Sequence, residues 1–175
     1  MNETIKSIKQ RRSIRSYQST PVPQHLLDQV LEAGTFAANG RNWQSCKIIC
    51  ITNPDLRNEV SKLNCKIGGW DESFDPFYGA PCILLVIADK SRPTYIYDGS
   101  LVMGNLMLAA HSVGLSSCWI HRAKEEMESE FGHNLLAKLG IEGEWEGIGH
   151  CALGYAAVEH PQAPARKEGW IHEIK

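Results

Sequence analysis

Hydrophobic and polar positions follow two different periods along this chain. Apolar residues recur at the spacing of amphipathic helices in residues 3–12, 26–38, 55–63, 98–113 and 127–139. Shorter apolar runs bounded by turn residues predict strands at residues 47–52, 82–87, 117–121 and 149–155. Helices and strands alternate, but the connections between strands are too irregular to demand an all-parallel sheet. We therefore expect an α+β fold, a three-layer α/β/α sandwich.

Two of these segments are more apolar than a half-exposed element would be. Residues 82–87 are apolar at consecutive positions, which predicts a strand buried on both faces at the centre of the sheet. The helix at 98–113 has little polar surface, so we expect it to be buried nearly all round, with Asp98 as its cap and Gly114 as its stop.

Other signals mark where elements begin and end. Asn53-Pro54 is a helix start, and Gly132 is expected to interrupt or soften the helix at 127–139. Residues 64–80 have no clean period and are expected to form a loop. Its aromatic residues either line a pocket or form a satellite hydrophobic cluster; they are Trp70, Phe74, Phe77 and Tyr78.

The composition is that of one folded, soluble domain spanning residues 1–175, with 43% hydrophobic and 22% charged residues. A net charge of −2 gives no electrostatic case for nucleic acid or an anionic membrane as the main partner. The N-terminal residues lack an apolar core of signal-peptide length, and the longest apolar run is too short to cross a bilayer. A cytoplasmic location follows by default.

The cysteines and histidines do not form a recognisable metal or nucleophile motif. The six cysteines are expected to be buried free thiols. Cys118-x-x-His121 and His150-Cys151 lack the second pair that a four-ligand zinc site needs, so no metal is expected. No cysteine has a nearby signature of an activated nucleophile.

A cluster of cations follows the first helix. Arg11, Arg12, Ser13 and Arg15 fall within five residues, and guanidinium forks beside a hydroxyl suit a phosphate. The alternative is that these cations only complement the negative end of the helix dipole. Taken alone, the cluster does not decide between the two interpretations.

Three further motifs follow in order. They are the polar segment 37–47, the stretch from Gly114 to Ile120 after the long apolar helix, and a tail with Gly154-Tyr155 and Arg166-Lys167. In this order and at these separations, the chain resembles the nitroreductase family of FMN-dependent oxidoreductases over nearly its whole length. The resemblance implies a mixed, mainly antiparallel sheet flanked by helices.

The resemblance also assigns roles at the flavin. Arg11, Arg12, Ser13 and Arg15 would hold the phosphate, the ribityl chain and the pyrimidine edge of FMN. Arg166 and Lys167 would close over the phosphate, although without the family they would be interpreted as a solvated terminal pair.

The segment after the second helix resembles the family's Pro-Ser-x-x-Asn-x-Gln-Pro-Trp loop, which reaches the flavin from the other subunit. Gly40, within this loop, is expected near the flavin, and Asn42 and Gln44 are the positions that match the pattern. Ala38 and Asn39 stand where Pro-Ser is usual, and Ser45-Cys46 replaces Pro-Trp, so the backbone is expected to differ. The alternative is an ordinary polar helix-to-strand connection.

Trp119, Ile120, His121 and Arg122 correspond to the family segment whose backbone amide is aimed at the reactive flavin nitrogen. His121 has the chemistry of a proton donor, but a structural role is favoured for it. His111, on the apolar helix, is expected to be a core residue.

By resemblance, the expected activity is ping-pong hydride transfer from NADH or NADPH through FMN to an electron-poor acceptor such as a nitroaromatic or a quinone. No catalytic side chain or metal is required. The family also implies a homodimer with the FMN site at the subunit interface, to which the 98–113 helix would contribute. Two alternatives remain: a flavin-dependent dehydrogenase or reductase of one metabolite, and a protein that stores or delivers FMN without turnover.

Overall fold

A four-stranded antiparallel sheet forms the middle of the protein. The computed structural model describes residues 2–175. The strands lie in the order β1-β2-β4-β3, and every neighbouring pair is antiparallel. Their bounds are β1 (Cys46–Ile51), β2 (Cys82–Asp89), β3 (Ser116–Ile120) and β4 (Trp145–Gly154).

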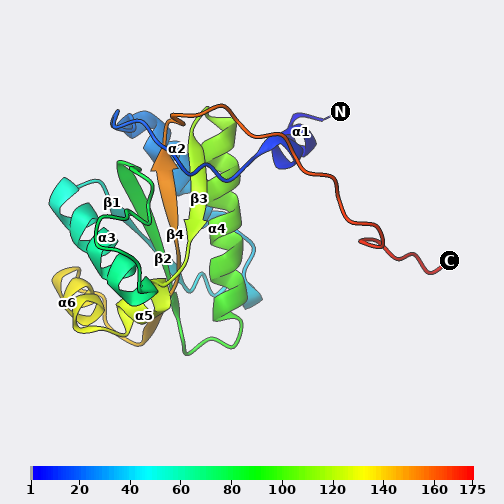
Figure 1. Ribbon diagram of the computed structural model, residues 1–175. Helices are drawn as coiled ribbons and strands as arrows, with labels where there is room; N and C mark the ends of the chain where they lie inside the picture. The colour runs from blue at the N-terminus through cyan, green and yellow to red at the C-terminus, as the bar shows by residue number, and fades with distance from the viewer. Residues whose placement is uncertain (1) are drawn as a thin grey trace.

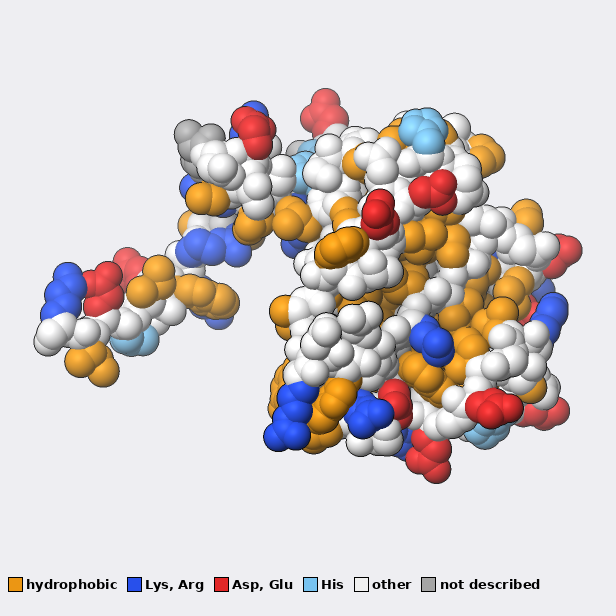
Figure 2. All heavy atoms as spheres, turned by 180° about the vertical axis from the view of Figure 1, so that it is seen from behind, with side chains coloured by type: hydrophobic (Ala, Val, Ile, Leu, Met, Phe, Trp, Pro, Cys, Tyr) orange, Lys and Arg blue, Asp and Glu red, His pale blue; other side chains and the backbone are white. Residues whose placement is uncertain are grey.

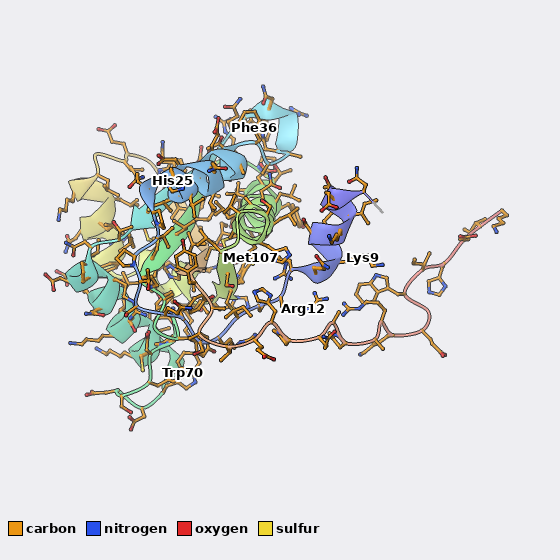
Figure 3. The ribbon with its side chains drawn as sticks, turned by 90° about the horizontal axis from the view of Figure 1, so that it is seen from above. Lys9, Arg12, His25, Phe36, Trp70 and Met107 are labelled. Atoms are coloured by element: carbon orange, nitrogen blue, oxygen red, sulfur yellow. The ribbon has the colours of Figure 1, made fainter. Side chains whose placement is uncertain are left out.

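Helices cover both faces of this sheet (Figures 1 and 3). One layer holds α3 (Pro54–Gly68), α5 (Ala123–Met127) and α6 (Glu130–Lys138), and the other holds α2 (Gln24–Thr35) and α4 (Tyr95–Ser112). A short 3-10 helix, η1 (Gly40–Asn42), precedes β1, and α1 (Glu3–Gln10) stands apart from the sheet. The predicted three-layer α+β sandwich is confirmed.

Strand β2 joins the two cores of the protein. Ile83, Leu85 and Ile87 pack in the core beneath α3, α5 and α6, while alternate residues such as Leu84 and Val86 pack against α2 and α4. Each of these side chains is at most 1% exposed, and burying one contributes about 1.5–3 kcal/mol. The prediction of a central strand buried on both faces is confirmed.

The predicted 64–80 loop is partly wrong, because α3 continues through Gly68. The helix ends where Gly69 takes a left-handed conformation, with φ of 67°. Its predicted start is confirmed: the Asn53 side chain accepts a hydrogen bond from the Leu56 N–H at 2.9 Å, and Pro54 occupies the first turn.

The predicted helix at 127–139 is instead two helices. The break falls at Glu128 and Ser129, between α5 and α6, and not at Gly132. Gly132 lies inside α6. A Cβ at this position would overlap the Met127 and Glu126 backbone, so glycine permits the close packing of α5 and α6. Helix α4 also begins three residues before Asp98, and β4 begins at Trp145 instead of residue 149.

Two burial predictions need correction. Helix α4 is not buried all round, since Tyr97 is 71% exposed and Leu101 is 49% exposed. The exposed side of α4 carries a helically spaced row of Tyr97, Leu101, Gly104 and Leu108. All six cysteines are free, but Cys50 is exposed and Cys46 is only half-buried, because both lie on edge strand β1.

The two ends of the chain extend from the same side of the body (Figure 1). Helix α1 has no buried residue, and the tail beyond Ala157 runs past it without helix or strand. The tail exposes Trp170, Ile171 and Ile174. Figure 2 shows hydrophobic side chains gathered across the middle of one face of the body. Both features leave apolar surface without cover in a single copy.

Candidate functional site

The segment that follows α1 lies against the start of strand β3. Ser13 forms a parallel bridge with Ser117, and the Ile14 N–H donates to the Ser117 carbonyl at 3.1 Å. Ile14 is 1% exposed and packs in the core, so the segment is fixed in register. This places Ser13, Arg11 and Arg15 beside Ser117 and Cys118. Their role at FMN stays a prediction.

Arg11 has an unsatisfied, buried donor. Within residues 2–175, its Nη1 has no hydrogen-bond partner. Burial raises the pKa of the nearby Cys118 thiol, while Arg15, Ser13 and Arg11 act in the opposite direction without overcoming it. Arg11 therefore contributes a buried donor without a partner, and Cys118 contributes a neutral thiol that is a poor nucleophile.

Arg12 is oriented differently from Arg11. Its Nη2 donates to the Lys9 carbonyl at 2.5 Å and its Nη1 donates to the Arg11 carbonyl, at the C-terminal end of α1. Arg12 therefore fits the helix-end alternative, whereas Arg11 fits the phosphate interpretation. Figure 3 shows Arg12 beside the C-terminal tail, close to α1.

The expectation that His111 is a core residue is wrong. It is half-buried at the C-terminal end of α4, beside a cavity of about 450 Å³ that Arg12 and His160 also line. Its ring lies 5.8 Å from the His160 ring. Burial, His160, Arg11 and Arg12 lower the pKa of His111, because each disfavours a further positive charge there.

The end of β3 is held in an unusual conformation. Arg122 has a φ of 78°, and its guanidinium lies 4.2 Å from the Trp70 ring centroid. Trp119 has a buried indole N–H with no partner in residues 2–175. In the same range, the backbone N–H groups of His121 and Arg122 donate to no protein acceptor. The two backbone donors could meet a planar ligand with ring nitrogens and oxygens, whereas the indole N–H is enclosed by protein.

The 38–44 loop is folded on itself. The Gln44 N–H donates to the Asn39 side chain at 3.0 Å, and the Gln44 side chain donates to Asn42 at 3.1 Å. Arg41, Asn42 and Gln44 all have φ near +50°, so the loop is strained as well as polar. Ala38 at its start is exposed.

Asp98 positions this loop. It is not the predicted cap of α4 but a buried carboxyl in the first turn, which accepts from the Gly40 N–H at 3.0 Å and from the Thr94 hydroxyl at 2.9 Å. The loop thus lies at the N-terminal end of α4, whereas His111 and the arginines lie at the other end. A rise of 1.5 Å per residue separates Asp98 from His111 by about 20 Å along the helix.

The tail residues are not brought to the arginine cluster within one chain. Arg166 and Lys167 are exposed, and the Arg166 side chain donates to the Pro164 carbonyl at 2.8 Å. Their role at a phosphate therefore stays a prediction.

Sequence reasoning missed a buried polar cluster of Asn64, Glu126 and His150, here called the Asn64 cluster. Glu126 Oε2 and His150 Nε2 are 2.6 Å apart, and Asn64 Nδ2 donates to Glu126 Oε1 at 2.5 Å. Asn64 Nδ2 also donates to the His121 carbonyl at 2.8 Å. Val60 and Asn64 are spaced to share one helix face, which is the available signal, but the sequence pattern predicts a loop from residue 64.

Among residues 2–175, no three His, Cys, Asp or Glu side chains gather in a way that could hold a metal ion. None of the described helices has the length and apolar character needed to cross a membrane.

The profile of the family described as "Nitroreductase family" matches residues 8–67 and 69–155. The chain belongs to the nitroreductase family. The match includes the arginine cluster, the 38–44 loop and the β3 segment, and stops before Arg166 and Lys167.

Individual relatives agree with this assignment. A protein of Bacillus subtilis named FMN reductase (NAD(P)H) is 38% identical over 94 residues, which are 53% of this chain and 34% of the relative. A Methanothermobacter thermautotrophicus protein with a provisional NAD(P)H nitroreductase name is 31% identical over 124 residues, 67% of this chain and 60% of the relative. The nitroreductase-family chain thus aligns with less than two thirds of each of these relatives.

A solved structure matches the whole nitroreductase-family chain. The crystal structure of a Bacteroides fragilis nitroreductase with bound FMN superposes with a TM-score of 0.88 at 26% identity, and each chain is covered completely. The arrangement of layers described above is therefore the arrangement of an FMN-binding member of the family.

Proposed function

We propose that this protein is an FMN-dependent oxidoreductase that takes electrons from NADH or NADPH and reduces an electron-poor acceptor, such as a nitroaromatic or a quinone. The observation that carries the proposal is the buried, unpartnered guanidinium nitrogen of Arg11 beside Ser13 and β3. A buried donor without an acceptor is costly, and a phosphate oxygen would satisfy it. The FMN-bound Bacteroides fragilis structure and the Bacillus subtilis FMN reductase support the same cofactor.

The residues present fit FMN. Arg11 and Ser13 would hold the phosphate, with Arg12, Arg166 and Lys167 as further candidates, while the backbone N–H groups of His121 and Arg122 would meet the polar edge of the ring beside Trp119. When bound, FMN supplies the capacity to accept a hydride from the nicotinamide and pass it on. Arg15 would stabilise negative charge at the pyrimidine edge.

The protein itself would bind and orient the reactants and would not need a nucleophile. Burial keeps the pKa of Cys118 above its ordinary value and raises that of Cys151 to about 12, so neither thiol is activated. His121 is not needed as an acid in this scheme and serves through its backbone.

We also propose that the protein is a homodimer with FMN at the subunit interface. The 38–44 loop lies at the opposite end of α4 from the arginines, and the family pattern it resembles reaches the flavin from the other subunit, so we assign Asn42 and Gln44 to the FMN of a second copy. The exposed row on α4 provides apolar surface for this contact. A cavity of about 740 Å³ along edge strand β1 would receive the partner's tail, whose apolar residues are uncovered.

A cytoplasmic location is part of the same proposal. Six free cysteines in residues 2–175 are typical of a reducing compartment.

The first test is the visible absorption spectrum of the purified protein, recorded before and after anaerobic addition of NADH and of NADPH. We expect flavin bands that bleach with at least one nucleotide and return when a quinone or a nitroaromatic is added. Flavin bands that persist with both nucleotides would favour storage or delivery of FMN. A colourless protein that does not bind added FMN would overturn the proposal.

Steady-state rates then separate a broad reductase from an enzyme of one metabolite. Comparable kcat/KM values for several quinones and nitroaromatics are expected. Uniformly weak turnover of all of them, with normal reduction by NADH or NADPH, would favour the dedicated enzyme.

A further inference from the structure

The turn after β3 is held by buried polar side chains from three other elements. Asn64 lies on α3, Glu126 on α5 and His150 on β4, and each is 0% exposed. The Asn64 amide nitrogen bridges the Glu126 carboxyl, at 2.5 Å, and the His121 carbonyl, at 2.8 Å. The imidazole of His150 completes the cluster at 2.6 Å from Glu126 and meets the Phe77 ring edge to face.

Close backbone packing restrains the same turn from the side of β4. A Cβ at Gly147 would overlap the Ala123 backbone, and a Cβ at Gly149 would come within 2.7 Å of the Trp119 ring. Glycine at these two positions therefore allows β4 to lie directly against the residues on both sides of His121 and Arg122. With Asn64 holding the His121 carbonyl, Arg122 is confined to its positive φ of 78°.

The side chains of the Asn64 cluster make one hydrogen bond to a group outside the cluster, from Asn64 Nδ2 to the His121 carbonyl, while Asn64 Oδ1 and His150 Nδ1 have no partner in residues 2–175. A buried polar cluster that is only partly satisfied is costly, so its bond to the turn is the feature that calls for a role. The peptide group that begins at that carbonyl carries the Arg122 N–H, which has no protein acceptor within residues 2–175. Because a peptide group is planar, fixing the His121 carbonyl also fixes the direction of the Arg122 N–H.

We propose that Asn64, Glu126 and His150 are positioning residues that aim the Arg122 backbone N–H at the ring of the bound flavin. Asn64 acts directly on the turn, while Glu126 and His150 hold the Asn64 amide in place. The inference rests on the proposed FMN site. The three residues are buried beneath the turn and do not touch FMN themselves, so they act only by orienting the Arg122 N–H.

The test compares Asn64→Leu with Val60→Ala, a second fully buried change on the same helix whose apolar side chain makes no hydrogen bond to the turn. The affinities of riboflavin and FMN for the full-length protein are measured by fluorescence titration. Asn64→Leu is expected to raise both dissociation constants at least tenfold and to leave their ratio unchanged, because the phosphate contacts are intact. Val60→Ala is expected to lower the melting temperature without changing either affinity.

Two further variants sharpen the result. Glu126→Gln keeps an acceptor for Asn64 and can pair with the other tautomer of His150, so it is expected to retain near-normal affinity. Asn64→Ala replaces Asn64→Leu if the leucine variant does not fold. An NMR spectrum of the apo-protein gives a readout without flavin: the Arg122 amide signal is expected to shift and broaden in the Asn64 variants and to stay unchanged in Val60→Ala.

Unchanged flavin affinities and an unchanged Arg122 signal in Asn64→Leu would overturn the inference. So would a loss of FMN affinity alone, because it would place the effect at the phosphate. If the wild-type protein binds neither riboflavin nor FMN, the proposed function fails, while the Arg122 signal still reports whether the cluster holds the turn.

Discussion

Arg11 and Arg12 are neighbours in sequence, and each has one buried guanidinium nitrogen without a partner in residues 2–175, Nη1 in Arg11 and Nε in Arg12. The two terminal nitrogens of Arg12 already donate to backbone carbonyls, whereas a terminal nitrogen of Arg11 is left for a ligand. Arg11→Gln is therefore expected to raise the FMN dissociation constant about 10- to 100-fold, the loss of one charge-assisted contact of about 1.5–3 kcal/mol. Arg12→Gln, the matched control, is expected to change it by less than about threefold. Equal losses in a fluorescence titration would show that both arginines hold the phosphate.

For single residues, the sequence predicts the cation cluster but does not show which arginine is left for a ligand and which is bonded to the end of α1. Which side chains around Ile14 are buried depends on the bridge between Ser13 and Ser117. This bridge joins segments about a hundred residues apart, so neighbouring residues in the sequence do not predict it. The same limit hid the Asn64 cluster, because Glu126 and His150 become neighbours of Asn64 only when three elements pack together.

The Asp75 carboxyl stabilises the connection between α3 and β2. Asp75 pairs with Arg57 at 2.5 Å, accepts from the Ser61 hydroxyl at 2.8 Å, and accepts from the Phe77 and Gly79 N–H groups. Burial by itself raises the pKa of Asp75, but these hydrogen bonds outweigh it and lower the pKa below its ordinary value. The stabilisation is therefore present above the unfolded-state pKa, near 3.9, and is lost as the pH falls through the lower folded-state pKa.

Asp75→Asn is expected to reduce the free energy of unfolding by about 1–2 kcal/mol at pH 7, because Arg57 loses its partner. The difference from wild type should shrink as the pH falls below about 4. Urea unfolding at several pH values measures both effects. Asp71→Asn is the control, since the Asp71 carboxyl is exposed and, among residues 2–175, accepts only from the N–H and hydroxyl of Ser73. A deficit for Asp75→Asn that stays constant down to pH 2 would contradict the charge-based account.

At the scale of elements, local signals were reliable where the chain itself supplies the cause. The Asn53-Pro54 start of α3 and the continuous apolar run of β2 were both predictable from neighbouring residues. The end of α3 and the break between α5 and α6 were not. The end of α3 depends on which of the two glycines, Gly68 or Gly69, takes the left-handed conformation. The break between α5 and α6 depends on the close contact between Gly132 and the end of α5.

A single copy of the protein exposes apolar surface that a second copy would cover. Helix α4 buries one side against the sheet and exposes Tyr97 and Leu101 on the other. The two parts of the proposed FMN site lie at opposite ends of the same helix. Dimerisation through α4 would therefore bury its apolar row and bring the loop of one copy towards the arginines of the other, which joins assembly and cofactor binding in one event.

Leu101→Lys tests this link, because it places a charge in the middle of the exposed row on α4 without touching the core. Light scattering of the wild-type protein at micromolar concentration is expected to give twice 19.5 kDa, and the variant is expected to approach 19.5 kDa. Its FMN affinity should fall at least tenfold with assembly, since Asn42 and Gln44 no longer reach the site. Asn58→Lys adds the same charge at an exposed position of α3 and should change neither the molecular mass in solution nor the FMN affinity. A variant that is monomeric but binds FMN normally would place the whole cofactor site within one chain.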